Sequence, residues 1–208
     1  MKLLYVILFF VGGECLEAVG ITMMTRTFNR MVSQNYDMCL LQAAREGKEA
    51  IVKRLVESGC NINVKGEDGK TPLIYAIDMG HENIVKYLLE RHCDVNIQTI
   101  GDRFSALLLA CLKDYGNIAK MLINVGANVN AVNIKGDSPL IFAVNNKNEN
   151  LVRRLIRKGA KIDHKNSDKH SPIGVALACC EAAEKQDKAD WEKMINLLID
   201  SLDVKFIR

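Results

Sequence analysis

The sequence predicts an all-α repeat solenoid of about five stacked helix–turn–helix units. The first observation is a motif of Ser or Thr, then Pro, then an aliphatic residue, which begins at Thr71, Ser138 and Ser171. The second is an alanine five residues after the start of each unit, at Ala43, Ala76, Ala110, Ala143 and Ala176. One such unit is too short to bury its own apolar face, whereas stacked units bury it between neighbours.

Each unit contains start and stop signals for two helices. The Ser or Thr hydroxyl can cap the free N–H groups of a first helix, and the following Pro fits its first turn. Gly47 and Gly80 predict the end of the first helix, because glycine adopts the left-handed conformation there. A second, amphipathic helix is predicted to end at Gly59, Gly126 and Gly159. A short extended piece such as 94–96 then leads into a polar turn such as 67–70.

The N-terminus differs from the repeats. Lys2 precedes an apolar run at 3–11, and small residues follow up to Gly20. These zones predict a signal peptide at 1–20, followed by a lead-in at 21–35. Two alternatives remain open: an uncleaved membrane anchor, or translation from a later start at Met23, Met24 or Met31.

Charge and cysteine content bound the function and the location. The net charge of +3 is too small to indicate nucleic acid by itself. The seven cysteines form no CxxC pair and no metal-binding spacing, so most are expected to be free thiols, which suit a reducing compartment. The protein is therefore expected to be secreted or in the secretory pathway if the signal is cleaved, and otherwise cytoplasmic or nuclear.

The residues 71–73 (TPL), 80–85 (GHENIV) and 126–131 (GANVNA) resemble the signature of the ankyrin repeat family. The resemblance covers about 36–204. It implies an L-shaped stack of paired antiparallel helices, with short β-hairpin loops projecting from one edge. The expected domain is 36–208, with repeats near 36–65, 66–98, 99–132, 133–165 and 166–204.

Several positions depart from the family pattern. Its usual His after Thr-Pro-Leu is replaced by residues that are mostly aliphatic, so apolar packing should take the place of that histidine's hydrogen bonds. Asp114 and Lys147 replace the Gly between the helices. His92 stands where other repeats have Gly, which predicts a positive φ. The fifth repeat has an insertion around 184–190, expected between its two helices.

The resemblance also implies where a partner would bind. In the family, variable hairpin tips and the exposed side of the inner helices form a concave binding surface. The positions expected to contact a partner are Met79, Ile100, Asp102, Phe104, Leu112, Lys113, Ile134 and Asp137. Exposed apolar groups rimmed by charge indicate such a surface. The alternative is that an inserted residue in the third hairpin lets Ile100 or Phe104 fold back onto the stack.

A basic cluster offers a second candidate. It lies on and after the second helix of the fourth repeat and comprises Arg153, Arg154, Arg157, Lys158 and Lys161. The cluster is either a solvated convex face or a site for an acidic partner.

These observations predict a non-enzymatic scaffold that binds a protein partner. No catalytic motif occurs, and we expect no cofactor, no small-molecule substrate, no nucleic acid and no stable membrane span. A metal site at His164 and His170 is conceivable, but exposed turn residues are the simpler interpretation. A monomer is expected. The alternative function is an inhibitor or regulatory subunit that covers an enzyme's site.

Overall fold

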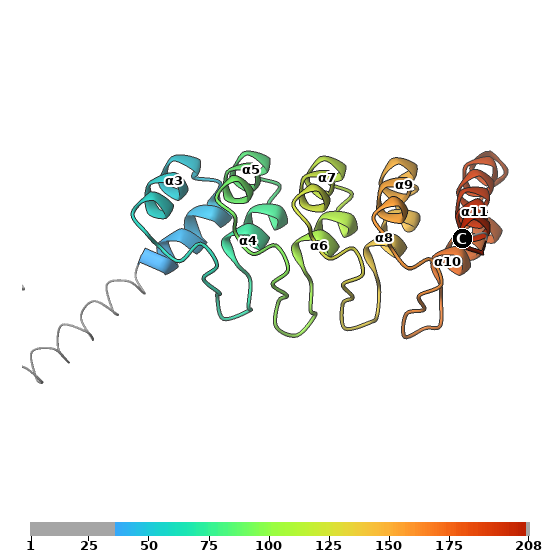
Figure 1. Ribbon diagram of the computed structural model, residues 1–208, viewed down its shortest axis with the longest axis horizontal. Helices are drawn as coiled ribbons and strands as arrows, with labels where there is room; N and C mark the ends of the chain where they lie inside the picture. Colours follow the sequence, from blue (N-terminus) through green and yellow to red (C-terminus); the bar gives the residue numbers. More distant parts are fainter. Residues whose placement is uncertain (1–35, 207–208) are drawn as a thin grey trace, which may run out of the picture.

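The computed structural model describes residues 36–206, which form five helix pairs stacked in a single row (Figure 1). The expected signal peptide at 1–20 and lead-in at 21–35 lie outside the described residues. The first pair is the helix of residues 36–46 with α3 (Glu49–Glu57). The others are α4 (Pro72–Asp78) with α5 (Glu82–Glu90), α6 (Ala106–Leu112) with α7 (Gly116–Asn124), α8 (Pro139–Asn145) with α9 (Glu149–Arg157), and α10 (Pro172–Ala182) with α11 (Lys185–Phe206).

The helices form two layers. The inner helices α4, α6, α8 and α10 each contact the next inner helix, and the outer helices α3, α5, α7, α9 and α11 do the same. The loops between repeats project from one edge of the row (Figure 1). Strand pairing among residues 36–206 is limited to one isolated bridge between Gln98 and Ser105. The predicted all-α repeat solenoid is therefore confirmed. Within the same residues, no helix has the length and apolar character needed to cross a membrane.

The inner helices begin at the caps that the sequence predicts. The hydroxyls of Thr71, Ser105, Ser138 and Ser171 accept hydrogen bonds from backbone N–H groups three residues later, at 3.2–3.4 Å. Proline occupies the first helical turn in α4, α8 and α10. The aliphatic replacements Ile74, Leu108 and Ile141 are buried. Apolar packing thus stands where the family usually has a histidine.

Left-handed backbone marks the helix ends in the first four repeats. Between the two helices, Gly47 and Gly80 have φ of 74° and 75°, and the substitutes Asp114 and Lys147 both have 55°. After the second helix His92 has φ of 58°, which confirms the conformation expected from its glycine equivalents. Left-handed backbone costs a residue with Cβ roughly 1–2 kcal/mol. Asp114, Lys147 and His92 therefore hold, with some strain, the backbone conformation that the repeat requires.

Asparagine side chains tie each repeat to the next. The Oδ1 atoms of Asn63, Asn96 and Asn130 accept hydrogen bonds from the N–H groups of Asp94, Asn128 and Lys161 in the following repeat, at 2.8, 2.8 and 2.9 Å. These asparagines end the repeated Asn/Asp-aliphatic-Asn pattern. The pattern therefore fixes the spacing of the stack as well as the path of the chain.

The fifth repeat corrects one expectation. Its insertion was expected between the helices, around 184–190, yet only residues 183–184 separate α10 from α11. The extra residues lengthen the helices: α10 has 11 residues where α4, α6 and α8 have 7, and α11 has 22 where the other outer helices have 9. Trp191, Met194 and Leu198 of α11 are buried. This longer helix pair covers the apolar face of the core at that end of the described stack.

Candidate functional site

The loops between repeats form a row of tips held at a fixed spacing. We call this the hairpin row, and it comprises residues 66–70, 99–104, 133–137 and 166–170. The N–H groups of Ile100, Ile134 and Ser167 donate to the carbonyl oxygens of Asp68, Asp102 and Lys135, at 2.9, 3.0 and 2.9 Å. Each tip is thus bonded to the one before it. A partner meeting this row would find a surface already ordered.

Two isoleucines are exposed at equivalent positions of the central tips. Ile100 is 71% exposed and Ile134 is 61% exposed. The same position is polar in the outer tips, where Glu67 and Ser167 stand. Isoleucine side chains with this much exposed surface contribute little burial to the stack. They form an apolar strip in the middle of the hairpin row.

Met79 and Leu112 extend the exposed apolar surface onto the inner helices. Met79 follows α4 and is 46% exposed, and Leu112 ends α6 and is 44% exposed. The hairpin row reaches this helix end, because Lys70 Nζ lies 3.0 Å from Asp78 Oδ2. The structure therefore brings four of the predicted residues, Met79, Ile100, Leu112 and Ile134, to exposed positions on one side of the stack.

Phe104 differs from that group. Its ring is half-buried against the core and stacks on Phe142 of α8, with centroids 6.2 Å apart. Its N–H donates to Thr99 Oγ1 at 2.9 Å, a bond that closes a loop one residue longer than the equivalent Asp137–Asn133 bond. The expectation that Phe104 faces solvent is wrong. The inserted residue lets Phe104 fold back onto the stack, whereas Ile100 stays exposed.

Charged residues beside the row are largely engaged within the chain. Lys113 Nζ lies 2.9 Å from Asp78 Oδ1, and Lys70 bonds the other oxygen of the same carboxylate. Partial burial alone would raise the pKa of Asp78, but Lys113 and Lys70 outweigh it and hold that pKa below its ordinary value. Lys113 and Asp78 therefore order the surface more than they offer free charges.

Asp137 and Asp102 also differ from each other. Asp137 accepts hydrogen bonds from Asn166 Nδ2 at 2.8 Å and from Asn133 Nδ2 at 3.2 Å, which links the third and fourth loops. Asp102 is exposed and contributes its backbone oxygen to the row. Of the two predicted carboxylates, Asp102 is therefore the more exposed to a partner.

Two structural contacts in the row were not apparent from the sequence. The Gln98 carboxamide donates to the carbonyl oxygens of Arg103 and Val132, at 2.8 and 3.0 Å, and so joins two loops. The Tyr75 hydroxyl donates to Asp68, with 3.1 Å to each carboxylate oxygen. The repeat register gives no signal for either, because both contacts depend on which way a side chain turns.

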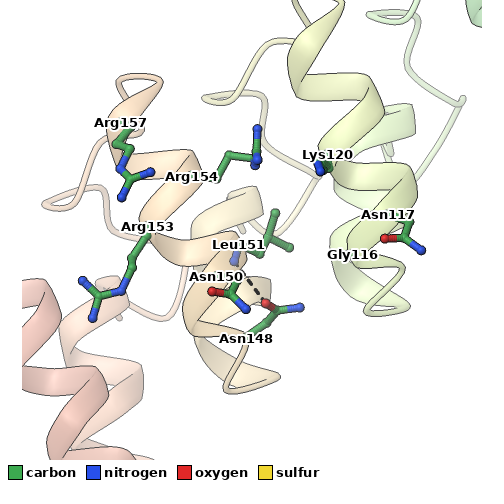
Figure 2. A pocket seen from close by; sticks show the side chains of 9 residues that line it. All are labelled: Gly116, Asn117, Lys120, Asn148, Asn150, Leu151, Arg153, Arg154 and Arg157. Carbon is green, nitrogen blue, oxygen red and sulfur yellow. Dashed lines mark hydrogen bonds between the residues drawn. The ribbon is translucent and has the colours of Figure 1, made fainter.

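The basic cluster lies on the opposite layer of the stack. A groove of about 460 Å³ runs between α7 and α9 (Figure 2). Three of the predicted cations line it, Arg153, Arg154 and Arg157, together with Lys120 and Asn117 of α7. Lys158 and Lys161 are exposed but do not line it. We call this feature the basic groove. Lys120 was missed in the sequence, although the repeat register places it in α7 where Arg153 stands in α9.

The surroundings of the cysteines and histidines indicate structural roles for these residues. The six cysteines of the described residues are free thiols. Burial raises the pKa of Cys93 to about 12 and that of Cys111 further, so both thiols stay protonated and unreactive. His164 Nε2 contacts the Gly136 oxygen at 2.7 Å. Residues 36–206 hold no group of three or more metal-ligating side chains.

Comparison with known proteins identifies the repeat. The family model described as ankyrin repeats (3 copies) matches residues 13–99, 91–166 and 107–201. The chain is 28% identical over 134 residues to the human neurogenic locus notch homolog protein 1, which covers 64% of this chain and 5% of that protein. It is 39% identical over 69 residues to the human transient receptor potential cation channel subfamily A member 1, covering 33% of this chain and 6% of that one. The chain thus corresponds to a small part of each relative.

Proposed function

Because the chain belongs to the ankyrin repeat family, we propose that it is a scaffold whose partner protein docks on the hairpin row and the adjoining ends of α4 and α6. Ankyrin repeats generally act as non-enzymatic modules for protein–protein interaction. We further propose that the surface in contact with the partner has Ile100 and Ile134 at its centre, with Met79 and Leu112 beside them.

One observation carries this proposal: the exposed isoleucines occur at the tips of the two central loops and nowhere else in the described hairpin row. Interface centres are apolar and their rims polar. Here the polar rim is supplied by Glu67 and Ser167 at the same position of the outer tips. Since the tips are already bonded to each other, little conformational entropy would be lost on binding.

The test begins with identification of the partner. The full chain is immobilised, and captured proteins are identified by mass spectrometry, beside the variant Ile100→Asp with Ile134→Asp. The matched control is Val125→Asp, which also places a carboxylate at an exposed apolar residue, but at the end of the outer helix α7. The affinity of the purified partner for all three proteins is then measured.

The expected result is that the double variant loses the partner while the control keeps it. Buried anchors at an interface centre commonly contribute about 2 kcal/mol or more each. The proposal is rejected if the double variant is folded and binds the partner as tightly as the original chain.

For localisation we propose entry into the secretory pathway, supported by the charged, apolar and small-residue zones of 1–20. The competing location, cytoplasm or nucleus, is supported by the buried free thiols of Cys93 and Cys111. N-terminal sequencing of the protein from its native source distinguishes the two. Loss of about the first 20 residues supports secretion, and an intact N-terminus on cytosolic protein rejects it.

A further inference from the structure

The outer helices α3, α5, α7 and α9 differ in charge. Their last residue is Glu57 in α3, Glu90 in α5, Asn124 in α7 and Arg157 in α9. Formal charge follows: α3 has two acidic and two basic residues, whereas α9 has one acidic residue and three arginines. Because equivalent positions have the same backbone conformation, this difference in charge comes from the side chains and not from the fold.

Two cations on the outer layer of the first two repeats are neutralised within the chain. Lys53 pairs with Glu49 at 2.6 Å, and Arg91 pairs with Glu57 at 3.3 Å. Both cations also lie over the Tyr87 ring, at 5.7 and 5.1 Å from its centre. Helices α3 and α5 together have four acidic and three basic residues, so the surface between them offers no net positive charge to a ligand.

The basic groove lacks these neutralising partners. Arg154 bonds the neutral Asn124 side chain at 3.3 Å, and Arg153 lies 3.9 Å from Glu149. Among the described residues, Lys120 and Arg157 form no ion pair. Four cations are thus gathered around one groove with a single, distant carboxylate among them. Such an excess favours an anionic ligand over internal pairing.

The placement of the cations indicates the shape of that ligand. Figure 2 shows Arg154 of α9 and Lys120 of α7 facing each other, while Arg153 and Arg157 extend from α9 away from α7 but still line the groove. The charged ends are spread along the helix and do not converge on one point. A single phosphoryl group would leave most of them unused. A run of carboxylates at intervals along an extended chain would meet them in turn.

We propose that the basic groove binds an acidic peptide segment, whose Asp and Glu side chains pair with Lys120 and Arg154 across the groove and with Arg157 at its α9 rim. A nine-residue helix is about 13 Å long, which matches about four residues of extended peptide. Arginine suits this role because its planar fork binds carboxylates through two hydrogen bonds. The exposed carboxamides of Asn117 and Asn150 can pair with the peptide backbone. This site is separate from the hairpin row and does not depend on it.

The test measures binding of a fluorescein-labelled hexaglutamate peptide, flanked by Gly and Ser, to the full chain by fluorescence anisotropy. Hexaglutamine in the same flanks is the uncharged reference. The variant is Lys120→Gln with Arg154→Gln. The matched control is Lys53→Gln with Arg54→Gln, which removes the same charge from α3; Arg54 occupies the position of Arg154 and Lys53 the position of Lys120. Circular dichroism establishes that both variants are folded.

We expect hexaglutamate to bind and hexaglutamine not to bind. The groove variant should weaken binding about tenfold, and the control should change it less than about twofold. Binding should also weaken as salt rises, because exposed charge pairs are screened.

Three results would overturn the proposal. Equal losses in the groove variant and the α3 control would mean that the peptide responds to overall charge alone. No preference for hexaglutamate over hexaglutamine would remove the role of carboxylates. Tighter binding of a Gly/Ser peptide with one phosphoserine, or of an oligothymidylate, would assign the groove to a phosphorylated partner or to nucleic acid.

Discussion

The hairpin row exposes isoleucines beside the carboxylate of Asp78, which two lysines hold, whereas helices α7 and α9 bury Ile118 and Leu151 and leave Lys120 and Arg157 without an ion pair among the described residues. Within each region, the backbone is the same from one repeat to the next. The side chains at their variable positions therefore set two different modes of binding. Release of water from apolar surface drives the first, and charge that salt can screen drives the second.

Among the predicted binding residues, Phe104 should be the one that the stack needs. Phe104→Ala should lower the free energy of unfolding by about 2 kcal/mol, roughly half the cost at a fully buried site, because the ring is half-buried on Phe142. Ile100→Ala at the exposed tip should change it by less than about 0.5 kcal/mol. Urea denaturation measures both. Equal effects would remove the distinction between structural and free apolar groups in the hairpin row.

Asp78 tests whether the paired charges of this face stabilise it. Asp78→Asn should cost about 1 kcal/mol near neutral pH, because two lysines lose their shared carboxylate. The lowered pKa sets the pH dependence: the contribution is present above the ordinary value of 3.8 and is lost as pH falls through the lowered folded-state pKa.

Urea titrations of both proteins at about pH 7 and about pH 2 measure this dependence. The stability difference between Asp78→Asn and the original chain should shrink in acid. A difference that stays constant across this range would show that ionisation of Asp78 contributes nothing.

The sequence predicted the stack well because its signals are local and repeated. Thr71 and Ser138 cap helices through contacts three residues away, so the motif alone specifies the contact. The conformation of His92 was predictable because Gly59, Gly126 and Gly159 show what its position requires. Comparison of equivalent positions in different repeats was therefore enough to predict these local features.

Contacts between repeats were harder to predict. The register shows that Phe104 occupies a usually polar position, but not that an inserted residue turns its ring toward Phe142. The helical path of 185–190 also escaped prediction, since an insertion has no equivalent in the other repeats. The basic groove depends on two helices 33 residues apart in sequence. The register aligns Lys120 with Arg153, but it does not show that the two helices line one groove.

His92→Gly concerns the outer helices, where a side chain sits in strained backbone. At φ of 58° glycine avoids the Cβ penalty, so the substitution should stabilise by up to about 1 kcal/mol. His92 is exposed, so little packing is lost. Thermal unfolding measures the change. An unchanged or lower midpoint would mean that the histidine makes a compensating contact, and the outer layer would then depend on its polar side chains.

Of these variants, Arg157→Gln should change stability least. It therefore tests whether Arg157 of the basic groove serves binding and not folding. Two opposing contributions act on Arg157. It lies four residues from Arg153, and like charges at this spacing destabilise a helix by about 0.2–0.5 kcal/mol. It also lies in the last turn of α9, where a cation gains about 0.3–1 kcal/mol from the helix dipole. These terms nearly cancel, so the free energy of unfolding should change by less than about 0.5 kcal/mol.

The affinity for hexaglutamate should nevertheless fall about threefold. Urea denaturation and anisotropy on one preparation measure both quantities. A loss of stability above about 1 kcal/mol would show that Arg157 serves the fold. The contrast between helices α3 and α5, which have no net positive charge, and the basic groove between α7 and α9 would then fail at Arg157.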